Sequence, residues 1–325
     1  MTPFSGIPLA KAIAFAADLH ADSHPPSSRL DTDYIETAVG KLQSIREACI
    51  KENVRFLFLG GDIFHRVTTT FECVRRAGAE LMKFREAGIT VGSIIGNHDL
   101  ARNQLEKLSK SPLNLLFDFG VLERLDLSRR VIINGKALIN PAGYLDKIPG
   151  ANKKAAYNFL IAHLFYNAPD IYGGKSLSSD MVNALGYDAI FLGHDHINYD
   201  IVRVGKTAIV RPGSILRGTS HKYNFERKVG FYILRDPANY SIKNFKFVEI
   251  PVKDMREVVS SLVIHKKEDL ADLSDLMGDL VVRLTETGGK KDEILETIMK
   301  DNKLPVGVRN LLLEYFKEEG ILIPS

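Results

Sequence analysis

The sequence predicts an α/β fold in which mixed sheets are flanked by helices. Apolar runs rich in β-branched and aromatic residues recur along residues 12–250, and amphipathic helical patterns separate several of them. The runs are hydrophobic almost without interruption, as expected for strands that are covered on both faces. The later runs follow one another without helices, so the sheets are expected to be mixed or antiparallel in that part.

The first third of the chain alternates strand and helix patterns. We expect strands at residues 12–17, 55–59 and 90–95, with helices at residues 33–52 and 70–87 between them. The first helical pattern places its apolar residues three or four positions apart. It begins at Asp33, which is a residue type that commonly caps helices.

The rest of the chain predicts six further strands and then a change of pattern. The strands are expected at residues 158–162, 188–192, 201–204, 207–210, 230–234 and 244–250. From Pro251 onward there are helical patterns at residues 267–277, 290–300 and 305–318 and one strand pattern at residues 280–284. We therefore divide the chain into a larger domain, residues 1–250, and a small C-terminal α/β domain, residues 251–325.

Composition and charge favour a non-membrane protein with a polyanionic substrate. No segment approaches the ~20 apolar residues of a membrane span, and the N-terminus has no signal-peptide pattern, so we expect a cytoplasmic protein with no membrane partner. Residues 1–250 contain 32 Lys and Arg against 25 Asp and Glu, a net charge of +7. Residues 251–325 contain 11 against 15, a net charge of −4. A basic larger domain is compatible with a polyanion.

Five short motifs, each directly after an apolar run, contain potential metal ligands. They are Asp18-Leu19-His20, Gly60-Gly61-Asp62, Gly96-Asn97-His98-Asp99, His163 and Gly193-His194-Asp195-His196. In open α/β sheets, ligands bind outside the carboxyl ends of the strands, so the fold would gather these residues at one edge. A lone histidine or asparagine of this kind is more often structural, but five motifs in this order predict a two-metal phosphoesterase centre.

The residue types at these positions favour particular metals and a particular bridging ligand. Carboxylates, imidazoles and one amide together suit Mn, Fe or Zn, and the absence of thiolates disfavours a purely structural zinc site. Two ions ~3.5–4 Å apart need a bridging ligand. Asp62 is the best candidate, because Gly60 and Gly61 before it allow the backbone to approach the ions closely.

The motifs together resemble the signature of the calcineurin-like metallophosphoesterases over about residues 11–235. Within it, Gly61-Asp62-Ile63-Phe64-His65 resembles the Gly-Asp-x-Phe-His of SbcD-type (Mre-type) DNA repair and recombination nucleases. Pro212-Gly213-Ser214 resembles the element that follows the last ligands in that group, and the chain looks most like its compact phage-encoded members. The resemblance implies a layered metallophosphoesterase sandwich with a small C-terminal capping domain, in the host cytoplasm if phage-encoded. The chain lacks the Gly-Asp-x-x-Asp-Arg-Gly of protein phosphatases, which argues against a phosphoprotein substrate.

The resemblance also implies roles for the site residues and two divalent metal ions, most often Mn, with Mg, Fe or Zn as alternatives. One ion would be held by Asp18, His20 and His196, and the second by Asn97, His163 and His194, with Asp62 bridging the two. His98 would donate a proton to the leaving oxygen, steadied by a nearby carboxylate, and His65 would contact the phosphate. A histidine that titrates near neutral pH suits the first task.

Basic residues in loops near the motifs are candidates for holding a DNA backbone without reading its sequence. These candidates are Arg29, Arg66, Arg102, Arg211, Arg217 and Lys222. Each alone is more often a solvated surface charge. The group between residues 211 and 222 is the more persuasive one, because it directly follows the last predicted ligands.

The resemblance implies a Mn-dependent DNA exonuclease or endonuclease that works with partners. The ATPase would be an SbcC-like ABC-type subunit on a separate chain, since this sequence has no complete phosphate-binding loop. A homodimer through the nuclease domain is also implied, to which the apolar segment at residues 112–119 could contribute. Two alternatives remain: a small-molecule or nucleotide phosphodiesterase with the same metal site, and a non-catalytic scaffold.

Overall fold

The computed structural model describes residues 10–26, 28–101, 104–168, 175–219 and 222–259. The helices and the strand expected between residues 267 and 318 lie outside these residues. The division at residue 251 therefore stays a prediction. None of the helices in the described ranges is long and apolar enough to cross a membrane.

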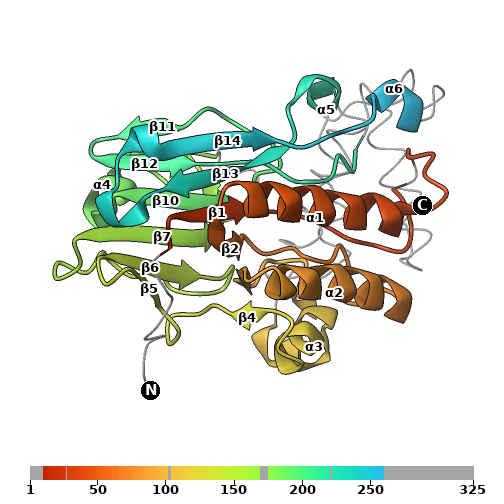
Figure 1. The fold of residues 1–325 in the computed structure, drawn as a ribbon, viewed down its shortest axis with the longest axis horizontal. Coiled ribbons are helices and arrows are strands. Elements are labelled where there is room, and N and C mark those ends of the chain that lie inside the picture. The colour runs from red at the N-terminus through yellow and green to blue at the C-terminus, as the bar shows by residue number, and fades with distance from the viewer. Residues whose placement is uncertain (1–9, 27, 102–103, 169–174, 220–221, 260–325) are drawn as a thin grey trace, which may run out of the picture.

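Two six-stranded sheets form the centre of the fold (Figure 1). The first sheet has the order β14 (Phe245–Glu249), β13 (Gly230–Arg235), β1 (Ala12–Ala16), β2 (Val54–Leu59), β3 (Thr90–Ser93) and β4 (Glu123–Arg124). The second has the order β11 (Val202–Val204), β12 (Thr207–Val210), β10 (Ala189–Gly193), β7 (Tyr157–His163), β6 (Ala137–Ala142) and β5 (Val131–Ile133). A small two-stranded sheet pairs β8 (Phe165–Tyr166) with β9 (Ser176–Leu177).

Both large sheets are mixed, as the sequence predicts. Strands β1 to β4 are parallel, and so are β6, β7, β10 and β12. The antiparallel pairs lie toward the edges, where β13 pairs with β1 and β14, β11 pairs with β12, and β5 pairs with β6. The late strands, β11 to β14, supply three of the antiparallel pairs. The expectation that no helix separates them is wrong, because helix α5 (Lys222–Glu226) lies between β12 and β13, and two 3-10 turns lie between β13 and β14.

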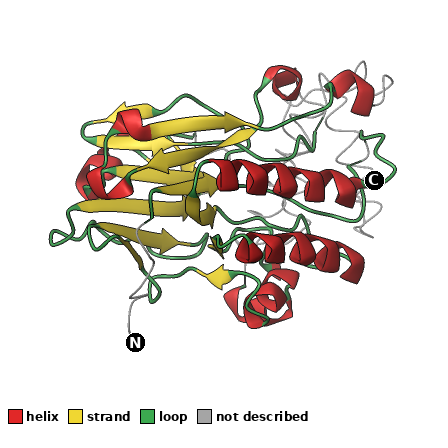
Figure 2. Cartoon of the chain, in the orientation of Figure 1, coloured by secondary structure: helices red, strands yellow, loops and turns green. Residues whose placement is uncertain are grey.

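Helices cover the outer faces of the two sheets, so that the layers run helix, sheet, sheet, helix. The larger helices are α1 (Tyr34–Lys51), α2 (Phe71–Glu86), α3 (Pro112–Asp118) and α4 (Ser179–Leu185). Figure 2 shows α1, α2 and α3 gathered on one side of the strands and α4 on the other. Shorter helices are α5 (Lys222–Glu226), α6 (Met255–Val258) and the 3-10 turns η2 (Leu105–Lys110), η4 (Pro237–Asn239) and η5 (Ile242–Asn244).

Alternation along β1 shows how the layers are built. Its alanines at positions 12, 14 and 16 pack with α1 and α2, whereas Ile13 and Phe15 point into the core between the two sheets. Small residues on one face allow the helices to approach, and large residues on the other fill the space between the sheets. The predicted cap of α1 is confirmed, because the Asp33 carboxylate accepts a hydrogen bond of 2.9 Å from the Glu36 amide.

Strands β5 and β6 form a hairpin that the sequence analysis missed. The turn between them is Asn134-Gly135, in which both residues have positive φ (50° and 68°). An Asn-Gly pair between apolar runs is the usual signal for such a turn. Pro141 in β6 hides that signal, because proline is unusual in a central strand. It is tolerated here because β5 pairs only with Ala137–Ile139, so no strand lies beside Pro141 on that side.

Candidate metal centre

The carboxyl ends of five strands bring the predicted ligands to one edge of the two sheets. Asp18 follows β1, Asp62 follows β2, Asn97 follows β3, His163 ends β7 and His194 follows β10. Three groups of potential ligand atoms result in the described residues, each with its atoms within 4.8 Å of one another, and one of them combines His20 with His65 and His98. The other two consist of predicted ligands alone. The first group is Asp18, His20, Asp62 and His196, and the second is Asp62, His163 and His194. All seven predicted ligands thus lie in or beside one centre, since Asn97 contacts His163.

The first group has the spacing of ligands around one ion. His20 Nε2 lies 2.9 Å from His196 Nε2 and 3.6 Å from the Oδ2 atom of Asp62. Two nitrogens bound at ~2.0–2.1 Å and at right angles to each other around one ion lie about 3 Å apart. The geometry therefore suits a single divalent ion between these side chains.

The second group is organised around His163. Its Nδ1 lies 2.7 Å from the Gly60 carbonyl oxygen, which places the ring hydrogen on Nδ1. Its Nε2 lies 2.8 Å from Asn97 Oδ1 and 3.3 Å from Asp62 Oδ2. A backbone carbonyl that holds one ring nitrogen and directs the other toward the site is the usual arrangement of a metal-binding histidine.

Asp62 lies between the two groups and presents a single oxygen to both. Its Oδ1 accepts a hydrogen bond of 2.9 Å from the His98 amide, whereas its buried Oδ2 has no hydrogen-bond partner. The same Oδ2 faces His20 in one group and His163 in the other. Because imidazoles of both groups approach this one carboxylate, the residues present fit a pair of cations, which Asp62 would help to hold.

The histidines of the centre differ in their readiness to bind a metal. Burial lowers the pKa of His196 to about 4 and lowers the pKa values of His20 and His194 well below their usual range, so these imidazoles are neutral at neutral pH. Burial also lowers the pKa of His163. The negative charges of Asp62 and Asp18 outweigh this effect and raise the pKa of His163 to about 9. An ion that binds His163 must therefore displace a proton.

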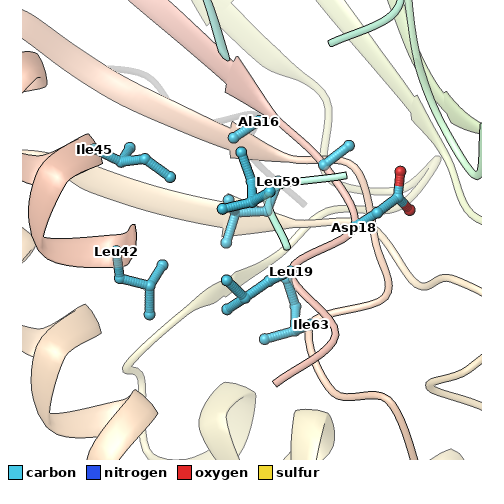
Figure 3. Close-up of a pocket in the computed structure, with 9 residues that line it drawn as sticks. Ala16, Asp18, Leu19, Leu42, Ile45, Leu59 and Ile63 are labelled. Carbon is cyan, nitrogen blue, oxygen red and sulfur yellow. The ribbon is translucent and has the colours of Figure 1, made fainter. Parts of the chain in front are cut away.

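An apolar wall behind the centre keeps Asp18 away from solvent. Figure 3 shows its carboxylate pointing away from Leu19, Leu59 and Ile63. These apolar side chains line a void of about 10 Å³. Burial raises the pKa of Asp18 to about 7, and both of its oxygens accept from the His194 amide at 3.0–3.1 Å. A cation at the centre would favour the ionised form.

Two glycines of the motifs are required by close backbone contact. A Cβ atom at Gly61, whose φ is 89°, would lie 2.7 Å from the Gly96 nitrogen and 2.8 Å from the His163 ring. A Cβ at Gly193 would lie 2.3 Å from the Gly60 oxygen. The sequence analysis expected Gly60 and Gly61 to allow approach to the ions. The structure adds that Gly61 and Gly193 let the loops after β2, β3 and β10 touch.

His98 and His65 lie together beside the first group of ligands. The His98 Nδ1 lies 2.8 Å from the His65 carbonyl oxygen, and the two rings stack with centroids 5.1 Å apart. The His98 ring also meets the His20 ring edge-on at 4.7 Å. The group that steadies His98 is therefore a backbone carbonyl, which corrects the expectation of a carboxylate. This contact uses Nδ1 and not Nε2.

Asp99 has a role that the sequence analysis did not assign. Its Oδ2 accepts hydrogen bonds from the Asp62 amide at 2.9 Å and from the Gly96 amide at 2.8 Å, all of them buried. It thereby fixes the loop after β2 to the loop after β3. Burial, followed by the charge of Asp62, raises the pKa of Asp99 to about 8. The sequence feature that could have indicated this role is the position of Asp99 as the fourth residue of the Gly-Asn-His-Asp motif.

Among the predicted phosphate contacts, Arg66 directly follows His65 in the sequence and has an exposed side chain. Its Nε donates to Asp22 Oδ2 at 2.7 Å, and 53% of the side chain is exposed. Asp22 itself is buried and accepts from the amide of Ser23 as well. This ion pair holds the Arg66 guanidinium next to His65.

The other candidates have different surroundings. Arg29 is paired with Asp31 at 2.7 Å. Arg211 is buried and stacks on the Tyr199 ring with its guanidinium carbon 3.8 Å from the centroid. Arg217 is buried and donates to backbone oxygens of Asn224 and Lys253. Arg102 and the Lys222 side chain lie outside the described parts of the structure.

Comparison with known proteins agrees with the geometry of the site. Residues 11–198, more than half of the chain, match the family of calcineurin-like phosphoesterases. The DNA double-strand break repair protein Mre11 of Halobacterium salinarum is 26% identical over 208 residues, which cover 60% of this chain and 47% of that protein. Mre11 of Archaeoglobus fulgidus is 31% identical over 88 residues, which cover 27% of this chain and 19% of that protein.

Further similarities are shorter or structural. The uncharacterised metallophosphoesterase YhaO of Bacillus subtilis is 31% identical over 90 residues, 26% of this chain and 22% of that protein. The alignments thus span less than half the length of each of these relatives. A dimetal phosphatase of Danio rerio has a similar structure, with a TM-score of 0.47 and 12% identity over 70% of this chain and 92% of that one.

Proposed function

This chain belongs to the calcineurin-like phosphoesterase family, and we propose that within it the protein is a metal-dependent DNA nuclease. The reaction would be hydrolysis of phosphodiester bonds at DNA ends or within strands. The observation that carries the proposal is the shared Asp62 Oδ2, which faces two separate sets of histidines. That arrangement fits a pair of metal ions, and a pair of ions is suited to in-line attack on phosphorus.

The chain's own residues would divide the work around the scissile phosphate. When bound, the two ions supply charge that stabilises the phosphate and lower the pKa of water. His98, held through Nδ1 by the His65 carbonyl, would give the proton at Nε2 to the leaving oxygen. His65 would contact the phosphate, and Arg66, fixed by Asp22, would hold a neighbouring phosphate of the strand.

The substrate part of the proposal is supported by the relatives and by charge. The curated relatives include two DNA double-strand break repair proteins, and the similarity to the first of them extends over 60% of this chain. Residues 1–250 carry a net charge of +7. A basic surface beside a phosphodiester-cleaving centre suits a polyanion such as DNA.

The proposal also covers the working metal and the protein partners. We propose manganese as the working metal, an SbcC-like ATPase as a separate subunit, and a cytoplasmic nuclease complex. A homodimer would use α3, where Leu113 and Leu116 are buried but Phe119, directly after the helix, is 74% exposed. An exposed aromatic residue of this kind suits a subunit contact.

The test compares substrates and metals with the full-length chain. Linear duplex DNA and an aryl phosphodiester are offered with Mn²⁺ and, separately, with Mg²⁺, with and without a candidate ATPase. We expect faster cleavage of DNA than of the aryl ester, and a ~10²–10⁴-fold loss in His98→Ala with the bound metal retained. A DNA rate no higher than that of the aryl ester would favour a small-molecule phosphodiesterase. Purified protein that contains no Mn, Fe or Zn and binds none would favour a scaffold.

A further inference from the structure

The backbone after the last predicted ligands is tied directly to two of them. The Ser214 amide donates to the His196 carbonyl oxygen at 3.1 Å, and the Ile215 amide donates to the Asp18 carbonyl oxygen at 3.2 Å. Gly213, with a φ of 74°, lies so close that a Cβ atom would be 2.8 Å from the same His196 oxygen. A shift of residues 213–215 would therefore also move Asp18 and His196, two ligands of the first group.

Arg227, which follows α5, holds this segment in place. Its Nη1 donates to the Ser214 carbonyl oxygen at 2.8 Å, and its Nη2 donates to the Ser214 hydroxyl at 2.9 Å and to the Leu216 carbonyl oxygen at 3.0 Å. Its Nε donates to Asn224 Oδ1 at 2.7 Å. All four hydrogen bonds thus come from one planar guanidinium group, whose N–H donors have fixed relative directions.

We propose that Arg227 is a positioning residue of the metal centre, which sets the places of Asp18 and His196 through residues 214–216. The guanidinium does not touch the ligands. It fixes the backbone that donates to their carbonyl oxygens, and so it limits the movement of the side chains on either side of the first ion. The inference rests on the metal centre of the proposed function and is independent of whether the substrate is DNA.

Charge and burial are consistent with this role. Burial lowers the pKa of Arg227 only to about 10, so the side chain stays charged at neutral pH. Ser214 and Leu216 are both buried, and water cannot readily replace the guanidinium there. In the second ligand group, His163 is held by the Gly60 carbonyl, and within the part of the chain that the structure describes Arg227 makes no hydrogen bond to that group. The effect of Arg227 should therefore fall on the ion held by Asp18 and His196.

The experiment measures metal binding rather than turnover. Full-length protein is stripped with EDTA, titrated with Mn²⁺ by calorimetry, and separately loaded with Co²⁺ to record the visible absorption of the bound ion. The variants are Arg227→Met, which removes all four contacts, and Arg227→Lys, which keeps the charge and can reach one acceptor. Arg235→Met is the matched control, because this arginine pairs with Glu52 on the surface and its side chain is 55% exposed.

We expect Arg227→Met to weaken one of two Mn²⁺ binding steps ~10–100-fold and to change the Co²⁺ spectrum, with a smaller loss in Arg227→Lys. Arg235→Met should bind as the wild type does. Wild-type affinity and spectrum in a folded Arg227→Met would overturn the proposal. If the methionine variant is unfolded in EDTA at 25 °C, then Arg227→Lys decides, and wild-type binding by that variant overturns the proposal equally. Weaker Mn²⁺ binding by Arg227→Met, together with failure of the metal-loaded wild type to cleave DNA, would refute only the DNA substrate and would leave the role of Arg227 standing.

Discussion

Replacing Asp99 by alanine tests whether the metal centre depends on a carboxylate that binds no metal. Asp99 Oδ2 accepts from the amides of Asp62 and Gly96, and both amides are buried. Alanine removes the acceptor and leaves two donors without partners in a space that is closed to water. The two loops that carry Asp62 and Asn97 would then be joined by fewer hydrogen bonds, with the bond from the His98 amide to Asp62 Oδ1 still present.

The magnitude follows from the two bonds. A buried donor left unsatisfied costs ~1–3 kcal/mol, so the two together should lower the free energy of unfolding by roughly 2–6 kcal/mol. Whole domains are stable by only about 5–15 kcal/mol, so this is a large fraction. Asp99→Asn keeps an oxygen for both amides, but its new NH₂ group occupies the place of Oδ1, which has no partner. We expect Asp99→Asn to lower the free energy of unfolding by about half as much as Asp99→Ala does.

The assay is urea unfolding followed by circular dichroism, in EDTA and in saturating Mn²⁺. Asp126→Ala is the control, because this carboxylate also accepts two hydrogen bonds, from the amide and the hydroxyl of Ser128, but at an exposed site. It should change stability by no more than ~0.5 kcal/mol. If Asp99→Ala costs as little as Asp126→Ala, the two buried hydrogen bonds do not organise the centre and our reasoning is wrong.

Three other predictions concern charge, backbone and pH. Arg66→Ala should weaken DNA binding evenly across sequences and reduce the salt slope of log K by about 1, measured by fluorescence anisotropy, and an unchanged slope would contradict the phosphate contact. Gly61→Ala should lower the Tm and the Mn²⁺ affinity, because its Cβ meets Gly96 and φ is positive. In EDTA the pKa of His163, raised from 6.5 to about 9, makes the Tm fall as the pH rises from 6.5 to 9, because the stabilising protonated form is lost in that window. The pKa of Asp18 is raised from 3.8 to about 7, so its contribution is lost at lower pH, between 3.8 and 7. Mn²⁺ should remove most of the fall above pH 6.5. A flat profile in EDTA would count against those shifts.

The layers of the fold could be predicted from the sequence because most of their signals are local. The apolar runs gave the central strands, and Asp33 gave the start of α1. The hairpin of β5 and β6 was missed although Asn134-Gly135 marks it, because Pro141 argues against a strand until the short length of β5 is known. That length depends on pairing between distant residues, which no local pattern contains.

The ligands of the site could be predicted for a different reason. Each follows a strand, and parallel strands bring their carboxyl ends together whatever the loops do. The contacts of Asp99 and Arg227 could not be predicted in this way. Asp99 acts on an amide 37 positions earlier, and Arg227 acts on a segment whose own partners are Asp18 and His196. Such contacts depend on how loops are arranged in space, so sequence patterns identify the metal ligands more readily than the residues that hold them.

Backbone strain links metal binding to the stability of this centre. Asp18, His20, Asp62 and His194 all have positive φ, between 48° and 86°, although none is glycine. Each such backbone conformation costs of order 1–3 kcal/mol. Backbone hydrogen bonds help to hold these residues in place, such as the bond of 2.9 Å from the His20 amide to the Asp62 carbonyl oxygen. Three of them also belong to the group around Asp62 Oδ2, which lies 3.6 Å from His20 Nε2 and 3.3 Å from His163 Nε2. Ions that bind only the folded centre should stabilise the folded chain by about 2.7 kcal/mol per site at a free concentration of 100 times Kd. The same strain that disfavours the metal-free fold thus keeps the ligand directions narrow, which is what a centre with a shared oxygen requires.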